Sequence, residues 1–116
     1  MELEIIYYNE KAQQNILRFP PVIQARYFNL TDRMQKFGPH LGMPHTRALG
    51  DGLFELRMKA KEGIGRVFFC TLTRRKQDTS VNRKIVILHS FVKKARKTPG
   101  QERDTARKRL LELRGT

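Results

Sequence analysis

The sequence has no tryptophan, one cysteine and few acidic residues, and these shortages exclude several classes of protein. Cys70 cannot form a disulfide within the chain. It lies in the apolar run VFFCTL, which favours a buried, unreactive thiol over a nucleophile. No apolar run approaches the roughly 18 residues that a membrane-spanning helix needs. Because MELEIIYYNE also lacks the features of a signal peptide, we expect a cytoplasmic protein with no membrane partner.

The sequence also lacks the clusters that hold metals and cofactors. His40 and His45 have no Cys, Asp or Glu at metal-ligand spacing beside them, so we interpret them as loop residues. No dinucleotide-binding motif or phosphate-binding loop occurs. We therefore expect neither a metal nor a cofactor.

Cations, by contrast, are abundant. The 24 Lys and Arg outnumber the 11 Asp and Glu, giving a formal charge of +13 on 116 residues. Residues 1–56 carry six cations and six anions, so the whole excess lies in residues 57–116. A strongly basic half indicates a polyanionic partner, usually a nucleic acid, or an acidic protein surface. A soluble protein that is merely basic is the alternative.

The length suits a single domain over residues 1–116 with one modest core. Enrichment in β-branched and aromatic residues predicts a strand over residues 3–8, with Asn9 as the N-cap of a helix. Two amphipathic helices follow, separated by a Pro-Pro pair and ended by a Gly-Pro pair. We expect them to form a hairpin with one apolar seam. Its residues are Ala12, Ile16, Phe19, Ile23, Tyr27, Leu30, Met34 and Phe37.

Residues 38–52 are rich in Gly and Pro and should form a connecting loop. Strands are expected over residues 53–60, 64–73 and 84–92, and the last is apolar enough to be buried on both faces. A C-terminal helix with a short apolar stripe should follow the N-cap candidate Thr98. The order β-α-α-β-β-β-α predicts an α+β fold with a small antiparallel sheet packed against the N-terminal helical hairpin.

Alternation along the strand over residues 53–60 separates two sets of side chains. The apolar set, assigned to the core, is Phe54, Leu56, Met58 and Ala60. The charged set, which must face water or a polyanion, is Glu55, Arg57, Lys59 and Lys61.

Three cationic positions lie on strands that should be neighbours. Arg57 is in mid-strand, Arg66 opens the next strand, and Lys93 with Lys94 closes the last. Opposed residues of an antiparallel sheet have Cβ atoms about 4.5–5.5 Å apart, so these cations can converge on one groove. Alternatively, Arg57 pairs with Glu55 or with Glu62 of the turn, or the charges are only solvated.

Two segments carry a family resemblance that covers essentially the whole chain. LGDGLFELRMKAKEGIGRVFF is similar to a hairpin of the HigB-like, phage-derived branch of the RelE/HigB toxin superfamily. IVILHSFVKKARKTP, which is followed by a helix, is similar to the C-terminal segment of the same branch. The resemblance implies a RelE-like fold and a toxin of a type II toxin-antitoxin system. It further implies a metal-independent, ribosome-dependent endoribonuclease (mRNA interferase), in which the RNA 2′-OH attacks the adjacent phosphate. The implied partners are the ribosome, mRNA and a cognate HigA-like antitoxin with a helix-turn-helix.

Carried over by position, the resemblance assigns catalysis to Arg57, Arg66, Lys93 and Lys94. Arginines can stabilise the charge that develops on the phosphorane oxygens, and we expect Arg66 to contact the scissile phosphate. Further cations are expected to bind RNA or the ribosome. They are Lys59, Lys61, Arg96, Lys97, Arg107 and Arg109.

Some relatives have a C-terminal aromatic residue or histidine, but nothing after Phe91 is of either type here. Phe91 and His89 are the candidates to replace it. His89 has the strand parity of Ile85, Ile87 and Phe91, which favours a core histidine over a catalytic one.

Two other functions remain open. A ParE-like toxin would share the fold but inhibit DNA gyrase, and that group typically lacks the converging strand cations. A plain nucleic-acid-binding module would use the +13 charge only for phosphate contacts. It would bind tightly without cleavage or toxicity.

Overall fold

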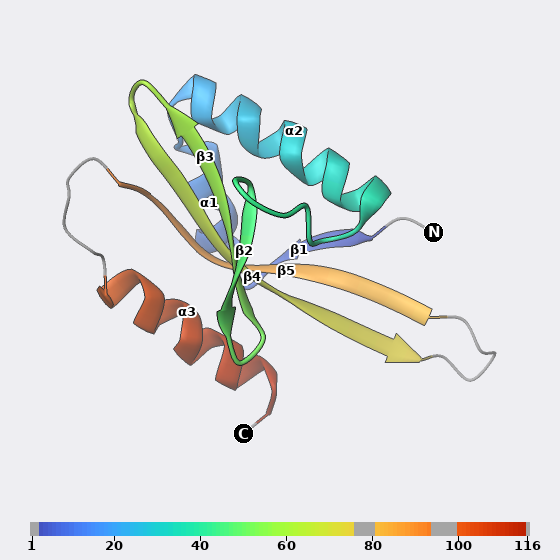
Figure 1. The fold of residues 1–116 in the computed structure, drawn as a ribbon. Helices are drawn as coiled ribbons and strands as arrows, with labels where there is room; N and C mark the ends of the chain where they lie inside the picture. The colour runs from blue at the N-terminus through green and yellow to red at the C-terminus, as the bar shows by residue number, and fades with distance from the viewer. Residues whose placement is uncertain (1–2, 76–80, 94–99, 116) are drawn as a thin grey trace.

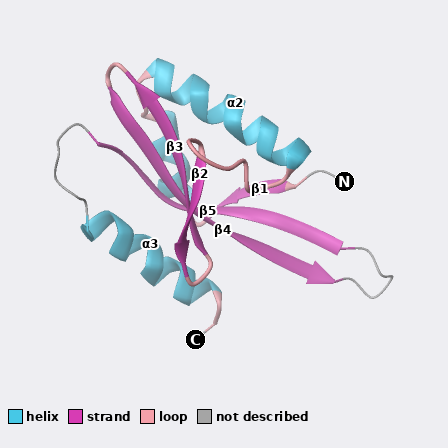
Figure 2. Cartoon of the chain, in the orientation of Figure 1, coloured by secondary structure: helices cyan, strands magenta, loops and turns pink. Residues whose placement is uncertain are grey.

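The computed structural model describes residues 3–75, 81–93 and 100–115, which form a five-stranded sheet covered by three helices (Figures 1 and 2). In chain order the elements are β1 (Glu4–Tyr7), α1 (Glu10–Leu17), α2 (Pro21–Phe37), β2 (Thr46–Gly50), β3 (Leu53–Ala60), β4 (Gly63–Arg75), β5 (Val81–Lys93) and α3 (Gly100–Leu113). None of the helices in these ranges is long and apolar enough to cross a membrane.

The sheet has the strand order β1-β5-β4-β3-β2 and is mixed. β1 runs parallel to β5, whereas the other pairs are antiparallel, so the expectation of a purely antiparallel sheet is wrong in this detail. The expected loop over residues 38–52 also contains a strand, β2, which pairs with β3. Pairing with the long neighbouring strand stabilises this short segment despite its Gly-rich flanks.

The first face of the sheet carries the main core, formed with α1 and α2. Asn9 caps α1 as predicted, because its side chain accepts a hydrogen bond of 2.8 Å from the backbone of Ala12. Phe37 is 79% exposed, so its assignment to the seam is wrong; it is the last residue of α2 and lies beyond the core. The buried members of the cluster include Ile16, Phe19, Ile23, Tyr27, Leu30, Met34, Leu56, Met58, Val67, Phe69, Ile85 and Ile87.

The second face carries a smaller core covered by α3 (Figure 1). Val86 and Leu88 point into it, so β5 is buried on both faces as predicted. From α3 it receives Ala106 and Leu110, whereas Leu113 is 36% exposed. Cys70 belongs to this core, and burial raises the pKa of its thiol to about 11, which keeps the reactive thiolate scarce near neutral pH.

Gly65 lets α2 approach the sheet closely. A Cβ atom there would lie 2.5 Å from Ile23 Cγ2 and 2.9 Å from Met58 Cε. We therefore expect Gly65→Ala to destabilise the fold by about 1–3 kcal/mol through overpacking. Chemical denaturation measures this, with Gly100→Ala as the control because a Cβ there meets nothing within 4 Å. Equal stabilities for the two variants would contradict the close packing.

Candidate functional site

β3, β4 and β5 bring the predicted cations into rows across the sheet. Arg57 lies opposite Arg66, and Arg66 lies opposite Phe91. In the next row Lys59 lies opposite Ile64, and Ile64 opposite Lys93. Residues two apart on a strand share a face, so these cations lie on one face, which is the face covered in part by α3. Arg57, Arg66 and Lys93 therefore share one face of the sheet, and their convergence on one groove stays a prediction.

Arg57 and Arg66 lie directly opposite each other on neighbouring strands. Arg57 donates its backbone N–H to the carbonyl of His45 at 2.8 Å, on the side away from β4. The pair is therefore a non-hydrogen-bonded one, in which opposed side chains approach most closely. Like charges in that arrangement repel unless a counter-charge lies beside them.

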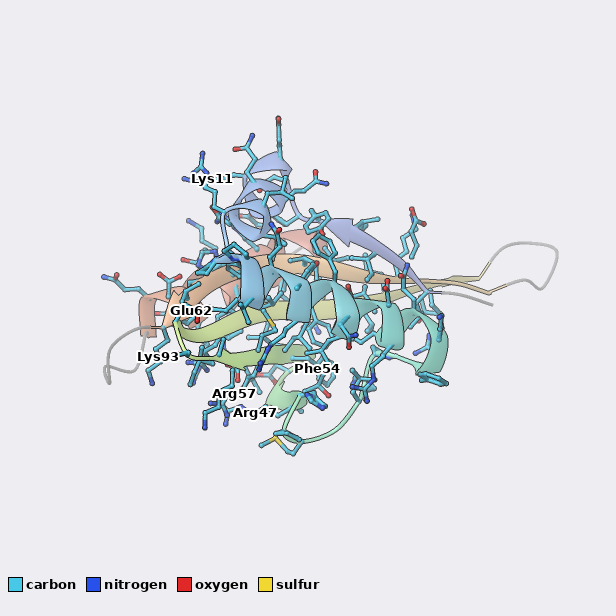
Figure 3. The ribbon with its side chains drawn as sticks, turned by 90° about the horizontal axis from the view of Figure 1, so that it is seen from above. Lys11, Arg47, Phe54, Arg57, Glu62 and Lys93 are labelled. Carbon is cyan, nitrogen blue, oxygen red and sulfur yellow. The ribbon has the colours of Figure 1, made fainter. Side chains whose placement is uncertain are left out.

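Glu55 supplies that counter-charge and is fully buried. Its Oε1 lies 3.1 Å from Arg47 Nε and 3.8 Å from Arg57 Nε, and its Oε2 accepts from Arg66 Nε at 2.6 Å and from Arg66 Nη2. In the view of Figure 3 the labelled side chains of Arg47 and Arg57 lie near one another. Three guanidinium groups thus surround one carboxylate, which leaves two positive charges uncompensated. Glu55 was expected on an open polar face; Arg66 and the second core cover it instead.

Arg66 is buried, with 6% of its surface exposed. Its guanidinium carbon lies 5.7 Å from the ring centre of Phe68 and 5.6 Å from that of Phe91, within the range of a cation–π contact. Arg66 was expected to open its strand, but β4 begins before it, at Gly63, and α3 covers part of its face. Its contact with a phosphate stays a prediction.

A bulge in β5 changes which face His89 and Phe91 occupy. Phe68 pairs with His89 but Phe69 pairs with Ile87, so β5 has one extra residue between these pairs. The bulge turns His89 and Phe91 toward α3, away from Ile85 and Ile87, and the parity expected from the sequence is wrong. The ring of Phe91 lies 5.9 Å from Phe68 and 6.4 Å from His89.

His89 pairs with α3. Its Nε2 contacts Glu102 Oε2, whereas its Nδ1 is buried without a hydrogen-bond partner among the described residues. The His89 side chain is 15% exposed and lies beside the cation rows. Because it contacts Glu102 of α3, it holds that helix against the sheet. Its place is therefore neither in the main core nor in open solvent.

The remaining predicted cations differ in their surroundings. Lys59 and Lys61 are exposed, and Lys93 is half-buried. Lys94, Arg96 and Lys97 lie outside the described residues. The open cations therefore lie at the end of the sheet where β3 turns into β4.

Arg107 and Arg109 are not free surface cations. Arg107 donates to the carbonyls of Leu49 at 2.9 Å and Gly50 at 3.4 Å, which ties α3 to β2. Arg109 donates to the Leu88 carbonyl at 2.6 Å, and its guanidinium carbon lies 5.0 Å from the ring centre of Tyr8. These contacts fit a structural role, and ribosome binding by the two arginines stays a prediction.

We expect Arg107→Ala combined with Arg109→Ala to lower the free energy of unfolding by about 1–3 kcal/mol, because the hydrogen bonds of both arginines to the sheet are lost. Thermal unfolding measures the change, and Lys108→Ala is the control, since Lys108 is exposed on the same helix. If the double variant is as stable as the control, the two arginines do not dock α3.

Sequence reasoning missed Arg47 and gave Glu55 too small a role. Arg47 lies in β2, inside a segment expected to be a loop, so it was not a candidate neighbour of Glu55. Glu55 was considered only as a partner of Arg57, whereas its closest partner is Arg66. An acid alternating with cations on a central strand was the available signal for a buried counter-charge.

The arrangement can bind and stabilise an anionic group. Arg57 is half-buried and Lys59 exposed, so their cationic groups are accessible, while Glu55 and the two aromatic rings fix Arg66 behind them. No group of three or more His, Cys, Asp or Glu that could hold a metal occurs in the described ranges. A phosphodiester on this face would meet guanidinium donors suited to its oxygens.

The family model described as Phage derived protein Gp49-like (DUF891) matches residues 14–111. The chain belongs to this Gp49-like family. The match covers every strand of this Gp49-like protein except β1, and it includes Glu55 and all the site residues named above. No curated protein matches the sequence.

Two solved structures resemble the Gp49-like chain. A mutant of the Escherichia coli toxin RelE in the free state has a TM-score of 0.54 and 10% identity, over 95% of this chain and 99% of that one. A chain of the toxin-antitoxin complex RelBE2 from Mycobacterium tuberculosis has a TM-score of 0.48 and 18% identity, over 80% of this chain and 100% of that one. Because the RelE match is only 10% identical in sequence, it shows the fold alone. The predicted RelE-like α+β fold is confirmed.

Proposed function

We propose that this protein is the toxin of a type II toxin-antitoxin system and that it cleaves mRNA on the ribosome. The observation that carries the proposal is the row of Arg57, Arg66 and Phe91 across three strands, with Glu55 as the one acid in contact with it among the described residues. The RelE-like fold and the Gp49-like family support it. The excess of cations suits a complex with ribosomal RNA.

In the proposed reaction the RNA 2′-oxygen attacks the adjacent phosphorus, and the bond from phosphorus to the 5′-oxygen breaks. Arg57 stabilises the negative charge that develops on the phosphorane oxygens, which needs no metal. Arg66, buried by Glu55 and the rings of Phe68 and Phe91, fixes this row of the sheet. One of Lys93, Lys94 and His89 accepts the proton that the 2′-OH loses as it attacks, and another of them gives a proton to the leaving 5′-oxygen.

Substrate binding extends the same site. Lys59 and Lys61 contact the RNA backbone beside the catalytic row, together with Arg96 and Lys97. Phe91 is half-buried, and its ring is the candidate surface against which a base can stack. The neutralising partner is a HigA-like antitoxin with a helix-turn-helix, and the site of action is the cytoplasm.

Induced expression in a bacterium tests the proposal, with primer extension on a reporter mRNA that is either translated or lacks its start codon. We expect growth arrest and new 5′ ends only in the translated reporter. Growth arrest with intact mRNA would contradict the nuclease and favour the ParE-like alternative. RNA binding without growth arrest would favour a plain binding module. Co-expression of the neighbouring open reading frame should restore growth.

A further inference from the structure

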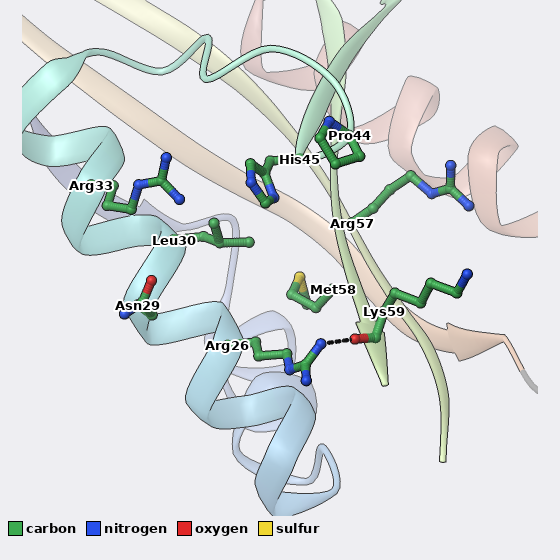
Figure 4. A pocket seen from close by; sticks show the side chains of 9 residues that line it. All are labelled: Arg26, Asn29, Leu30, Arg33, Pro44, His45, Arg57, Met58 and Lys59. Carbon is green, nitrogen blue, oxygen red and sulfur yellow. Dashed lines mark hydrogen bonds between the residues drawn. The ribbon is translucent and has the colours of Figure 1, made fainter. Parts of the chain in front are cut away.

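A cavity of about 530 Å³ lies between α2 and the edge of the sheet, on the other side of β3 from the cation rows (Figure 4). Its floor is apolar, formed by Leu30, Met58 and Pro44. Arg26 and Arg33 line it from α2. Among the described residues that line it there is no Asp or Glu. The cavity is therefore an apolar slot with cations along one wall.

The opposite wall is the backbone of an edge strand. β2 pairs with β3 only as far as Leu56, so β3 from Arg57 to Ala60 is the edge of the sheet. Figure 4 shows the side chains of Arg57 and Lys59 pointing away from α2, which leaves their main chain facing the cavity. Since Arg57 and Lys59 share backbone orientation, the N–H and C=O of Lys59 also point outward from the sheet.

One of these outward groups already has a substitute partner. The Lys59 carbonyl accepts a hydrogen bond from Arg26 Nη1, as a neighbouring strand would otherwise provide. Two residues earlier on the strand, the backbone N–H of Arg57 donates a hydrogen bond to the His45 carbonyl. The remaining backbone groups of this edge match the pattern that an added strand recognises.

We propose that this slot binds an extended, acidic segment of a partner protein, which adds to the sheet beside β3. An apolar side chain of the segment fills the slot over Leu30 and Met58, and its carboxylates pair with Arg26 and Arg33. The charge of +13 favours an acidic partner. RNA fits the slot less well, because a backbone edge and an apolar floor offer little to a phosphate chain.

The test uses the purified full chain and a fluorescent, end-capped peptide of alternating Glu and Val, with binding measured by fluorescence anisotropy. We expect Arg26→Glu with Arg33→Glu to weaken binding at least about tenfold, since two attractions become repulsions. The matched control is Lys11→Glu with Arg18→Glu, the same charge change at exposed positions of the other helical segment. This pair should bind the peptide nearly as well as the unchanged protein.

Three further measurements separate the outcomes. Arg33→Glu alone leaves the Arg26 contact with Lys59 in place and should still weaken binding, which excludes loss of the fold as the cause. Methylation of alternate peptide nitrogens should abolish binding; equal binding would overturn strand addition. A single-stranded RNA probe should be insensitive to the Arg26 and Arg33 changes. If RNA alone binds and these changes abolish it, the slot is a phosphate site and the proposal is wrong.

None of these readouts depends on RNA cleavage. The arginine variants should retain growth arrest, because neither side chain belongs to the proposed catalytic rows. Loss of peptide binding with retained growth arrest would support both proposals. If both the Arg33→Glu variant and the double Arg26 and Arg33 variant still bind the peptide, the slot proposal is wrong and the nuclease proposal is unaffected.

Discussion

Glu55→Ala is expected to lower the free energy of unfolding by about 3–5 kcal/mol, the effect of leaving a buried charge without its partner. Arg66 is buried beside this carboxylate and would keep its charge in an apolar setting. Arg47 and Arg57 would also repel it at close range. Denaturant unfolding followed by circular dichroism measures the change.

Two comparisons make this result specific. Glu62→Ala removes an exposed acid from the turn between β3 and β4 and should leave stability nearly unchanged. Replacing Glu55 and Arg66 together by Met should recover most of the loss, because no unpaired charge remains in the core. A Glu55 variant as stable as the Glu62 variant would show that the carboxylate does not hold the arginines.

Arg57→Ala is expected to reduce mRNA cleavage on translating ribosomes by roughly 100- to 1,000-fold, the usual effect of losing a donor to the developing oxyanion. Its effect on stability should stay below about 1 kcal/mol, because the side chain is 35% exposed and lies 3.8 Å from the Glu55 carboxylate. Cleavage rates by primer extension and thermal unfolding on the same preparation separate the two effects.

Arg83→Ala is the matched control for Arg57. Arg83 is exposed on β5 and pairs with Thr73, far along the sheet from the cation rows. The Arg83→Ala variant should cleave mRNA at close to the rate of the unchanged protein. If Arg57→Ala is as active as Arg83→Ala, the catalytic row is misplaced and the proposed mechanism loses its main cation.

The fold was predictable because its elements have clear periodicities and stop signals. The apolar stripe of α2 from Ile23 to Met34, and the continuous apolar run of β5, needed only local pattern to be recognised. β2 was not predictable, because TRALG has no strand pattern and forms only through its pairing with β3. The bulge at Leu88 was also hidden, since it depends on the register between β4 and β5.

The shared face of Glu55, Arg57 and Lys59 was predictable, but the electrostatics of the candidate site were not. The alternation of Glu55, Arg57 and Lys59 placed these residues on one face correctly. Their burial depends on α3, which covers part of that face from a distant part of the chain. The local sequence pattern therefore could not predict how deeply each of these side chains is buried.

The neutral and the basic half of the sequence do not form separate regions of the structure. Arg26 and Arg33 belong to the neutral half, yet they line a cavity against β3 of the basic half. Arg107 and Arg109 belong to the basic half, yet they hydrogen-bond to backbone carbonyls of β2 and β5. The helical segment before β2 therefore carries more than a structural role in this account.

The most direct measurement is the chemistry of the mRNA ends produced on translating ribosomes. The account predicts a 5′-hydroxyl downstream of the cut and a 2′,3′-cyclic phosphate upstream, formed in the presence of EDTA at a concentration that leaves the ribosome intact. An mRNA with a 2′-deoxy nucleotide at the cut position should stay whole. A 5′-phosphate at the cut, or cleavage of the 2′-deoxy substrate, would contradict attack by the 2′-oxygen at a cationic site.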